Sequence, residues 1–160
     1  MKGTYCLIIE VEKDSKISVG RLEELQFKRG FYIYVGSALN SLESRVTRHL
    51  SSKKKLHWHA DYLLMDSSSN IKEVIYSIGE EKIECSLASL ISDKSSPMIR
   101  FGCSDCSCGS HLFYFKDYDD ALKGVLSAFE DLELSVNNLD DFNKIMNKNS
   151  KNKTKNNCGI

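Results

Sequence analysis

The 160-residue sequence predicts an α/β or α+β fold, in which a small, mainly antiparallel β-sheet is flanked by helices. Short segments rich in β-branched and aromatic residues, such as 4–11, are typical of buried strands. Other segments, such as 40–50, repeat apolar residues at spacings of three and four, as amphipathic helices do. With 41% hydrophobic and 28% charged residues, the chain has the composition of a globular domain and can bury a core.

Strands are expected where short apolar runs lie between turn-forming residues. One such run has Gly30 before it and Gly36 after it, and another alternates apolar and polar residues. The strands are predicted at 4–11, 31–35, 71–78, 98–101 and 111–115.

Helices are expected from their apolar stripes. In the first, the stripe from Leu39 to Leu50 has a helical period, and Ser41 can cap its start. Arg45 and His49 are four residues apart and should therefore lie on one face of this helix. The helices are predicted at 40–50, 83–92, 119–133 and 138–146.

The chain divides into three parts. Residues 1–135 form the expected main domain, which includes a cysteine-rich loop at 102–111, and 136–146 form a C-terminal helix. Residues 147–160 are almost entirely Asn, Lys, Ser and Thr. Because such a segment cannot bury enough apolar surface to order itself, we expect a disordered tail.

The charges are balanced overall but not locally. The 22 basic and 22 acidic residues exclude a protein held to nucleic acid by bulk charge alone. Residues 21–60 nevertheless contain eight basic and three acidic residues, whereas 117–141 contain one basic and eight acidic residues. These stretches are either two solvated faces of opposite sign, or a face toward a phosphate backbone and a face away from it.

The sequence also suggests a compartment. It has no apolar run of roughly 20 residues, the length of a membrane-spanning helix. Its first residues lead directly into a predicted strand, so no signal peptide is evident and a cytoplasmic protein is expected. In that compartment, the six cysteines should be reduced thiols or metal ligands rather than a disulfide framework.

Several motifs, in this order, resemble the GIY-YIG nuclease superfamily. Two strand motifs are followed by a helix that carries an arginine, and a later segment resembles a helix whose start carries a metal-binding glutamate. The motifs are Gly3-x-Tyr5, Tyr34-Val35-Gly36-Ser37-Ala38, Leu42-x-x-Arg45-x-x-x-His49 and residues 83–88. The strand motifs have Thr and Val where the superfamily's name has Ile, and the spacer between them is longer than usual.

The sequence looks more narrowly like a mostly archaeal family of uncharacterised GIY-YIG-like proteins. Its members are sometimes fused to an endonuclease III-type glycosylase. Residues 34–38, the run His-Trp-His-Ala-Asp-Tyr-Leu-Leu at 57–64 and the cysteine-rich residues 102–108 carry this resemblance. It covers roughly residues 3–117 and has no counterpart of the superfamily's late asparagine.

The resemblance implies a Mg²⁺-dependent endonuclease that hydrolyses DNA phosphodiester bonds, acting on branched or damaged DNA in repair or processing. Glu84 would bind Mg²⁺, which activates water and neutralises phosphate. Arg45 would clamp the phosphate, and Tyr5 would help to deprotonate the attacking water with Tyr34 or His49. The implied catalytic residues are Tyr5, Tyr34, Arg45, His49, His59 and Glu84. The expected DNA contacts are Gly36, Ser37, Arg48, Lys53, Lys54 and Lys55.

Residue types alone leave ordinary roles open for each of these groups. The tyrosines could be core aromatics, Arg45 a surface residue and Glu84 a solvated carboxylate. His57, His59 and Asp61 would share one face of an extended segment. They could bind a metal or phosphate, or form hydrogen bonds around Trp58.

The cysteine-rich loop suggests a second kind of chemistry. Cys103, Cys106, Cys108 and His111 have spacings that suit tetrahedral Zn²⁺, to which Cys85 could contribute. Reduced thiols in a tight turn, or a redox pair, fit the same pattern. The rivals to the nuclease are therefore a non-catalytic nucleic-acid-binding module and a zinc or thiol protein. The sequence does not indicate an oligomeric state.

Overall fold

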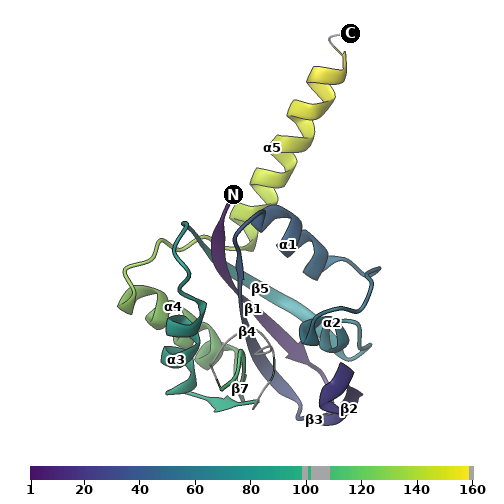
Figure 1. Cartoon of the computed structure of the whole chain (residues 1–160), viewed down its shortest axis with the longest axis vertical. Coiled ribbons are helices and arrows are strands. Elements are labelled where there is room, and N and C mark those ends of the chain that lie inside the picture. Colours follow the sequence, from purple (N-terminus) through teal and green to yellow (C-terminus); the bar gives the residue numbers. More distant parts are fainter. Residues whose placement is uncertain (99–100, 102–108, 159–160) are drawn as a thin grey trace.

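An antiparallel five-stranded sheet forms the centre of the molecule and carries helices on both faces (Figure 1). The computed structural model describes residues 1–98, 101 and 109–158, with side chains as far as residue 151. The strand order is β5-β1-β4-β7-β6, and every pairing is antiparallel. The strands are β1 (Gly3–Val11), β4 (Gly30–Ala38), β5 (Ser69–Ile78), β6 (Ser96–Pro97) and β7 (Leu112–Phe115). The expected α+β class is confirmed.

The connection between β1 and β4 contains its own small hairpin. Strands β2 (Ser15–Ser18) and β3 (Glu24–Phe27) pair antiparallel, and a short 3₁₀ helix, η1 (Gly20–Leu22), lies between them. This hairpin accounts for the long spacer between the two strand motifs. It leaves β1 and β4 directly paired, with Tyr5 opposite Gly36.

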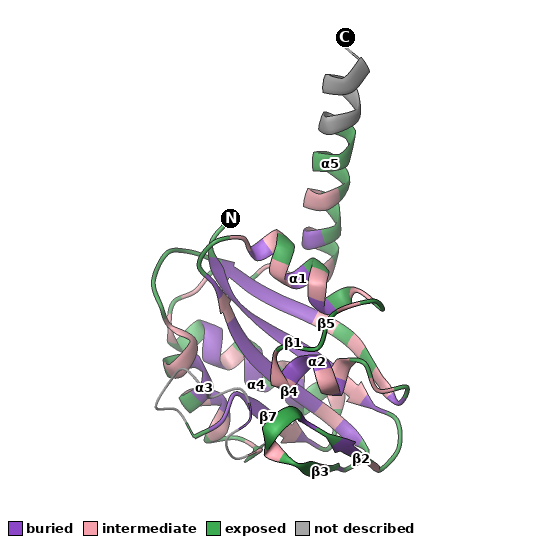
Figure 2. Ribbon diagram, turned by 45° about the vertical axis from the view of Figure 1, so that its right-hand side comes forward, coloured by how far each residue is buried: buried purple, intermediate pink, exposed green. Residues whose placement is uncertain are grey.

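Two helices cover each face of the sheet. Helices α1 (Leu42–Leu50) and α2 (His59–Leu64) lie on one face, and α3 (Glu84–Ser92) and α4 (Tyr118–Asp131) on the other (Figure 1). The central strands are buried on both sides (Figure 2), so their sequences are nearly continuous apolar runs.

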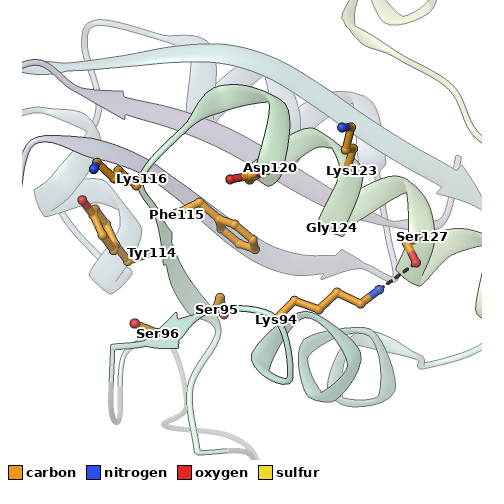
Figure 3. Close-up of a pocket in the computed structure, with 10 residues that line it drawn as sticks. All are labelled: Lys94, Ser95, Ser96, Tyr114, Phe115, Lys116, Asp120, Lys123, Gly124 and Ser127. Carbon is orange, nitrogen blue, oxygen red and sulfur yellow. Dashed lines mark hydrogen bonds between the residues drawn. The ribbon is translucent and has the colours of Figure 1, made fainter.

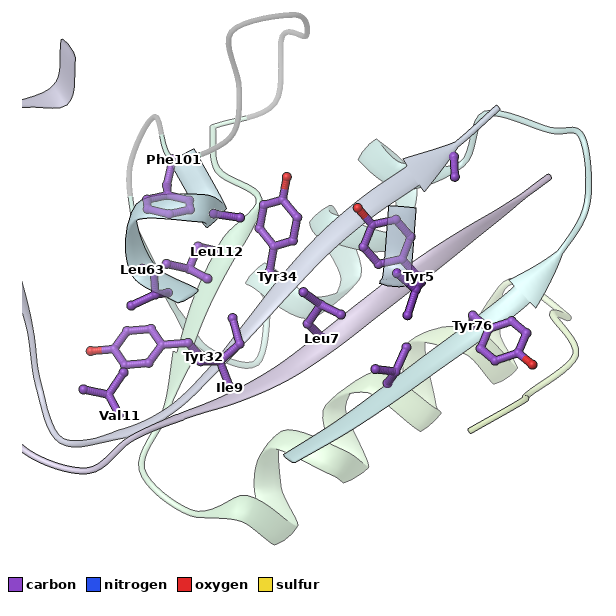
Figure 4. Close-up of a cluster of buried hydrophobic side chains, with 14 of the residues drawn as sticks. Tyr5, Leu7, Ile9, Val11, Tyr32, Tyr34, Leu63, Tyr76, Phe101 and Leu112 are labelled. Atoms are coloured by element: carbon purple, nitrogen blue, oxygen red, sulfur yellow. The ribbon is translucent and has the colours of Figure 1, made fainter. Parts of the chain in front are cut away.

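Alternation along β1 produces two cores. Tyr5, Leu7 and Ile9 point toward the α1 and α2 side (Figure 4), whereas Cys6 and Ile8 pack under α3 and α4. A single strand thereby supplies both hydrophobic layers.

The C-terminal helix is longer than the sequence predicts. Helix α5 runs from Leu139 to Cys158, so the expected disorder from residue 147 onward is wrong as far as residue 158. Phe142 anchors its first turns, with its ring centroid 6.1 Å from that of Tyr76. Once a helix is nucleated, each further residue adds a hydrogen bond at little cost, and no Gly or Pro interrupts 139–158.

One other expectation about local structure is wrong, and a second lies partly outside the described residues. The strand predicted at 98–101 includes residues 99–100, which the structure does not describe, and β6 lies just before it at Ser96–Pro97. The segment with His57 and His59 is not extended, because α2 begins at His59. The Asp61 carboxylate accepts hydrogen bonds from the backbone N–H groups of His57 and Trp58, which favours a helix start there.

The helices in the described ranges give no membrane-spanning candidate. None of them combines the length and the apolar character that a bilayer crossing requires.

Candidate active site

A buried phenol and a buried imidazole form the centre of the candidate site. Tyr5 Oη lies 2.7 Å from His49 Nε2, and the two side chains come from β1 and α1. The Tyr34 ring, from β4, has its centroid 6.5 Å from that of Tyr5 and 5.8 Å from that of His49. Three residues predicted from separate motifs are thus brought together by the fold.

Gly36 makes room for this arrangement. A Cβ atom at Gly36 would lie 2.5 Å from both Cζ and Oη of Tyr5. The Tyr5 ring therefore crosses over Gly36 on the neighbouring strand, and any larger residue would displace it. Gly36 was expected to contact DNA, but it is buried beneath this ring, so its role is steric.

Burial keeps both central groups neutral in the resting protein. It lowers the pKa of His49 to about 3, and the nearby positive charge of Lys54 acts in the same direction. Burial also raises the pKa of Tyr5 well above its usual value, with Tyr34 adding to the shift and the charge of Arg45 opposing it. The Nδ1 atom of His49 is buried and has no hydrogen-bond partner among the described residues.

Arg45 lies at the edge of this centre and is half-buried. Its Nη1 atom donates a hydrogen bond to the Ser37 carbonyl at 3.3 Å. Its Cζ atom lies 4.2 Å from the centroid of the Trp58 ring, within cation–π distance. These two contacts hold the guanidinium in place. Its positive charge acts to lower the pKa of Tyr5.

Glu84 comes from the helix on the other face of the sheet and acts on the site through its charge. Helix α3 packs under the sheet through Leu87 and Ile91, but its first residue, Glu84, is half-buried. The negative charge of Glu84 helps to raise the pKa of Tyr5 and opposes the lowering of the pKa of His111 by burial. The charge of the carboxylate therefore acts on both Tyr5 and His111.

Glu84 is the carboxylate that the sequence predicts as a metal ligand. No group of three or more His, Cys, Asp or Glu side chains gathers at one point within the described residues. Mg²⁺ is commonly held by only one or two carboxylates, together with water and substrate phosphates. Glu84 fits that pattern.

Arg48 takes part in an internal ion pair. Its Nη1 and Nη2 atoms donate to the two carboxylate oxygens of Asp61 at 2.9 and 2.7 Å, and Nη2 also donates to the Lys55 carbonyl at 2.7 Å. Asp61 is fully buried, and a buried carboxylate requires such a partner. The ion pair holds Arg48 but leaves its side chain partly exposed, so the expected DNA contact at Arg48 stays a prediction.

The three lysines after α1 also differ from one another. Lys54 is half-buried, and its Nζ atom donates to the His49 carbonyl at 2.7 Å, near the C-terminus of α1. Lys53 and Lys55 are exposed. The expectation of DNA contacts is therefore retained for Lys53 and Lys55, whereas Lys54 stabilises the helix.

Trp58 is the site residue that the sequence analysis treats only as structural. The Cζ atoms of Arg45 and Arg48 lie 4.2 and 4.1 Å from the centroid of its ring. The same ring lies 6.1 Å from that of His49. It is the only tryptophan in the chain and is flanked by histidines, which is the one signal that could have indicated this role.

His59 lies at the outer end of the aromatic cluster. Its ring centroid is 5.5 Å from that of Phe101, which is in turn 6.4 Å from that of Tyr34. Burial lowers the pKa of His59. The structure thus places His59 beyond Tyr34 rather than beside the Tyr5–His49 pair.

The suggested zinc site can be examined only in part. Cys103, Cys106 and Cys108 lie outside the described residues, whereas His111 is buried with its Nε2 atom 4.0 Å from Cys85 Sγ. Cys85 is disulfide-bonded, which differs from the expectation of reduced thiols or metal ligands.

Comparison with protein families places the chain in one of them. The profile of a domain of unknown function, DUF123, matches residues 4–134. The chain belongs to the DUF123 family. This DUF123 domain includes the sheet, the four helices that flank it and every residue of the candidate site, whereas α5 lies beyond the match. Searches of curated proteins and of solved structures found no match.

A separate cavity lies on the other side of the DUF123 domain. It has a volume of about 590 Å³ and lies between the end of α3, β6, β7 and α4 (Figure 3). Lys94, Lys116 and Lys123 line it together with Asp120, and Lys94 Nζ donates to Ser127 Oγ at 2.7 Å. None of the predicted catalytic residues contributes to its wall, so the cavity is separate from the candidate site.

Proposed function

We propose that this chain is a GIY-YIG-type, Mg²⁺-dependent endonuclease domain that hydrolyses DNA phosphodiester bonds. The observation that carries the proposal is the buried hydrogen bond between Tyr5 Oη and His49 Nε2, with Tyr34 and Arg45 beside it. The charge of Glu84 also reaches Tyr5. Phosphodiester hydrolysis requires a proton acceptor, a cation for the phosphate and a metal ligand, and the site supplies all three.

Folding alone does not explain this polar centre. Burying a phenol and an imidazole costs free energy that leucine side chains would not cost. Residues with strongly shifted pKa values gather at active sites because catalysis needs them there. The pair of Tyr5 and His49 meets this criterion in both directions, since burial raises the pKa of one and lowers that of the other.

The residues would divide the chemistry as follows. Arg45 binds a non-bridging phosphate oxygen and stabilises the charge that develops there, with Trp58 holding its guanidinium plane. Glu84 would hold Mg²⁺, and the metal would supply Lewis acidity at the phosphate.

The proton of the attacking water would move through Tyr5. Tyr5 Oη gives its proton to His49 Nε2 as it takes one from the water, so the phenol is restored and the imidazole becomes positive. The low pKa of His49 opposes this step in the resting protein. A bound phosphate brings negative charge near the imidazole and raises its pKa, which couples proton transfer to the presence of substrate. Tyr34 lies beside both rings and orients the phenol.

The setting of the reaction follows from the resemblance. We propose branched or damaged DNA as the substrate and repair or processing in the cytoplasm as its context. A non-catalytic DNA-binding module is the second candidate, because the exposed Lys53 and Lys55 can contact phosphates whether or not hydrolysis occurs.

Cleavage assays with matched variants test the proposal. Purified protein is incubated with branched, flap and plasmid DNA, with and without Mg²⁺. We expect metal-dependent cleavage, and losses of about 10²–10⁴-fold in rate for Tyr5→Phe and Glu84→Gln.

Two control variants make the result specific. Tyr76→Phe removes another buried phenol directly opposite Tyr5 on β5, and Glu81→Gln neutralises an exposed carboxylate just before α3. Both should cleave at the wild-type rate. If the wild type and Glu84→Gln are equally inert while both bind DNA, the chain is a binding module and the proposed reaction is wrong.

A further inference from the structure

A second, larger cavity lies on the outer side of α1, next to the candidate site. It has a volume of about 930 Å³ and lies between α1, the loop of residues 51–55 and α5. Hydroxyl groups of Ser44, Thr47 and Ser51 line the α1 wall, and Met146, Asn149 and Ser150 form the α5 wall. We call this cavity the α1–α5 groove.

The free charge in the α1–α5 groove is positive. Its acidic residue, Glu43, is paired with the N-terminal ammonium group of Met1 at 2.8 Å. Its arginine, Arg48, is paired with Asp61. Lys53, Lys54 and Lys55 remain, and 142–160 contain no acidic residue at all.

The lysine loop is held in place before any ligand binds. Ser51 Oγ donates to the Lys53 carbonyl at 2.8 Å, and Arg48 Nη2 donates to the Lys55 carbonyl at 2.7 Å. Because the backbone is fixed by these bonds, the loop presents its exposed ammonium groups with little further loss of entropy.

The α1–α5 groove adjoins the candidate site through one aromatic ring. Arg48 lines the groove, Arg45 borders the Tyr5–His49 pair, and Trp58 lies within about 4 Å of both guanidinium groups. A chain of phosphates that leaves the site past Arg45 would therefore enter the groove.

We propose that the α1–α5 groove binds the sugar–phosphate backbone of one nucleic-acid strand that extends from the scissile phosphate. The inference rests on the proposed function and adds a strand path to it. Lysine ammonium groups contact the phosphates, and the hydroxyl and amide groups of the walls add sequence-independent hydrogen bonds. The groove then contributes affinity and register but no sequence preference.

DNA binding measured without metal tests the groove independently of any cleavage. Fluorescence anisotropy with labelled single-stranded and duplex DNA, in a metal chelator and over a range of salt concentrations, gives the affinity and its salt slope. Lys53→Gln/Lys55→Gln should weaken binding about tenfold, and should reduce the slope by about 0.7–0.9 for each phosphate that the lysines no longer neutralise. Lys116→Gln/Lys123→Gln removes the same charge from the cavity of Figure 3 and should leave the affinity and the salt slope unchanged.

A neutral obstruction tests the groove without altering charge. Asn149→Trp places an indole in the groove from α5 and should weaken binding several-fold with an unchanged salt slope. Asn147→Trp makes the same change at an exposed α5 position outside the groove lining and should have no effect. A preference for the single strand indicates a displaced strand in the groove, and equal affinities indicate one strand of a duplex.

Several results would overturn the inference. They are equal reductions of affinity in the two lysine variants, equal affinities for the two tryptophan variants, or no DNA binding by the wild type. If the wild type binds through the groove but never cleaves, the strand path stands and the proposed hydrolysis is wrong.

Discussion

The two faces of the sheet bury different kinds of side chains. Under α3 and α4, the buried side chains are mainly apolar, such as Ile8 and Phe129, and they include the titratable His111 beside Cys85. Under α1 and α2, the buried set also includes the imidazole of His49 and the carboxylate of Asp61. The same strands, β1 and β4, supply both faces, so strand sequence alone does not account for the difference.

The difference indicates which side is maintained for folding and which for chemistry. Apolar burial on the α3 and α4 side stabilises the domain at about 25 cal/mol per Å². The polar groups on the α1 and α2 side reduce that gain unless each has a partner. A domain that only needed to fold would not require them, which supports a functional role for that side.

The largest effect on stability should come from the buried ion pair. Arg48→Gln leaves the buried Asp61 carboxylate without its charged partner and should lower the free energy of unfolding by about 3–5 kcal/mol. Urea denaturation followed by circular dichroism measures this change. Lys72→Gln breaks the exposed Lys72–Glu10 pair and should cost less than about 1 kcal/mol. Similar costs for the two variants would contradict a special role for the buried pair.

A smaller effect is expected where the Tyr5 ring crosses β4. Gly36→Ala forces a Cβ atom against that ring and should cost about 1–3 kcal/mol, as overpacking does. It should also reduce cleavage, because the phenol is displaced from His49. Gly79→Ala, where nothing lies within 4 Å of the added atom, is the matched control for both stability and rate. Wild-type cleavage by Gly36→Ala would show that the position of the phenol does not matter.

The pH dependence of stability should report on His49. Its folded pKa of about 3 lies below the unfolded value of 6.5, so the unfolded state binds more protons between these values. The His49 contribution therefore falls as the pH falls below 6.5, by at most about 1.4 kcal/mol per pH unit. His49→Gln should show a shallower pH dependence of the unfolding free energy in urea titrations. Parallel curves for the two proteins would mean that the imidazole is not held neutral by the fold.

The smallest effect on stability should come from the end of α5. Deleting residues 148–160 leaves Leu139, Phe142 and Met146, the α5 residues that pack on the core, in place. The free energy of unfolding should change by less than about 0.5 kcal/mol, whereas DNA binding through the α1–α5 groove should weaken because Asn149 and Ser150 are removed. A large fall in thermal stability would show that the distal turns support the domain.

The sequence by itself determined the local elements and predicted the central residues of the candidate site. Apolar runs and alternation predicted the long strands, and apolar residues at spacings of three and four predicted the first, third and fourth helices. Such patterns are visible because a packed face constrains residues that are close in sequence. Tyr5, Tyr34, Arg45 and His49 were found because each belongs to a short motif at a fixed place in a strand or helix. The sequence indicated that position 36 needs a glycine, but it did not show that the Tyr5 ring lies against it.

The tertiary structure decided which polar groups are used internally. Arg48 and Asp61, 13 residues apart, have ordinary surface residue types, and only the docking of α2 on α1 makes them an ion pair. The same docking places Trp58 between two arginines, and the packing of α3 brings Glu84 to Tyr5 across the sheet. These contacts depend on three-dimensional distance, which no local pattern encodes. For the same reason, the sequence could not distinguish Lys54, which supports a helix, from its exposed neighbours Lys53 and Lys55.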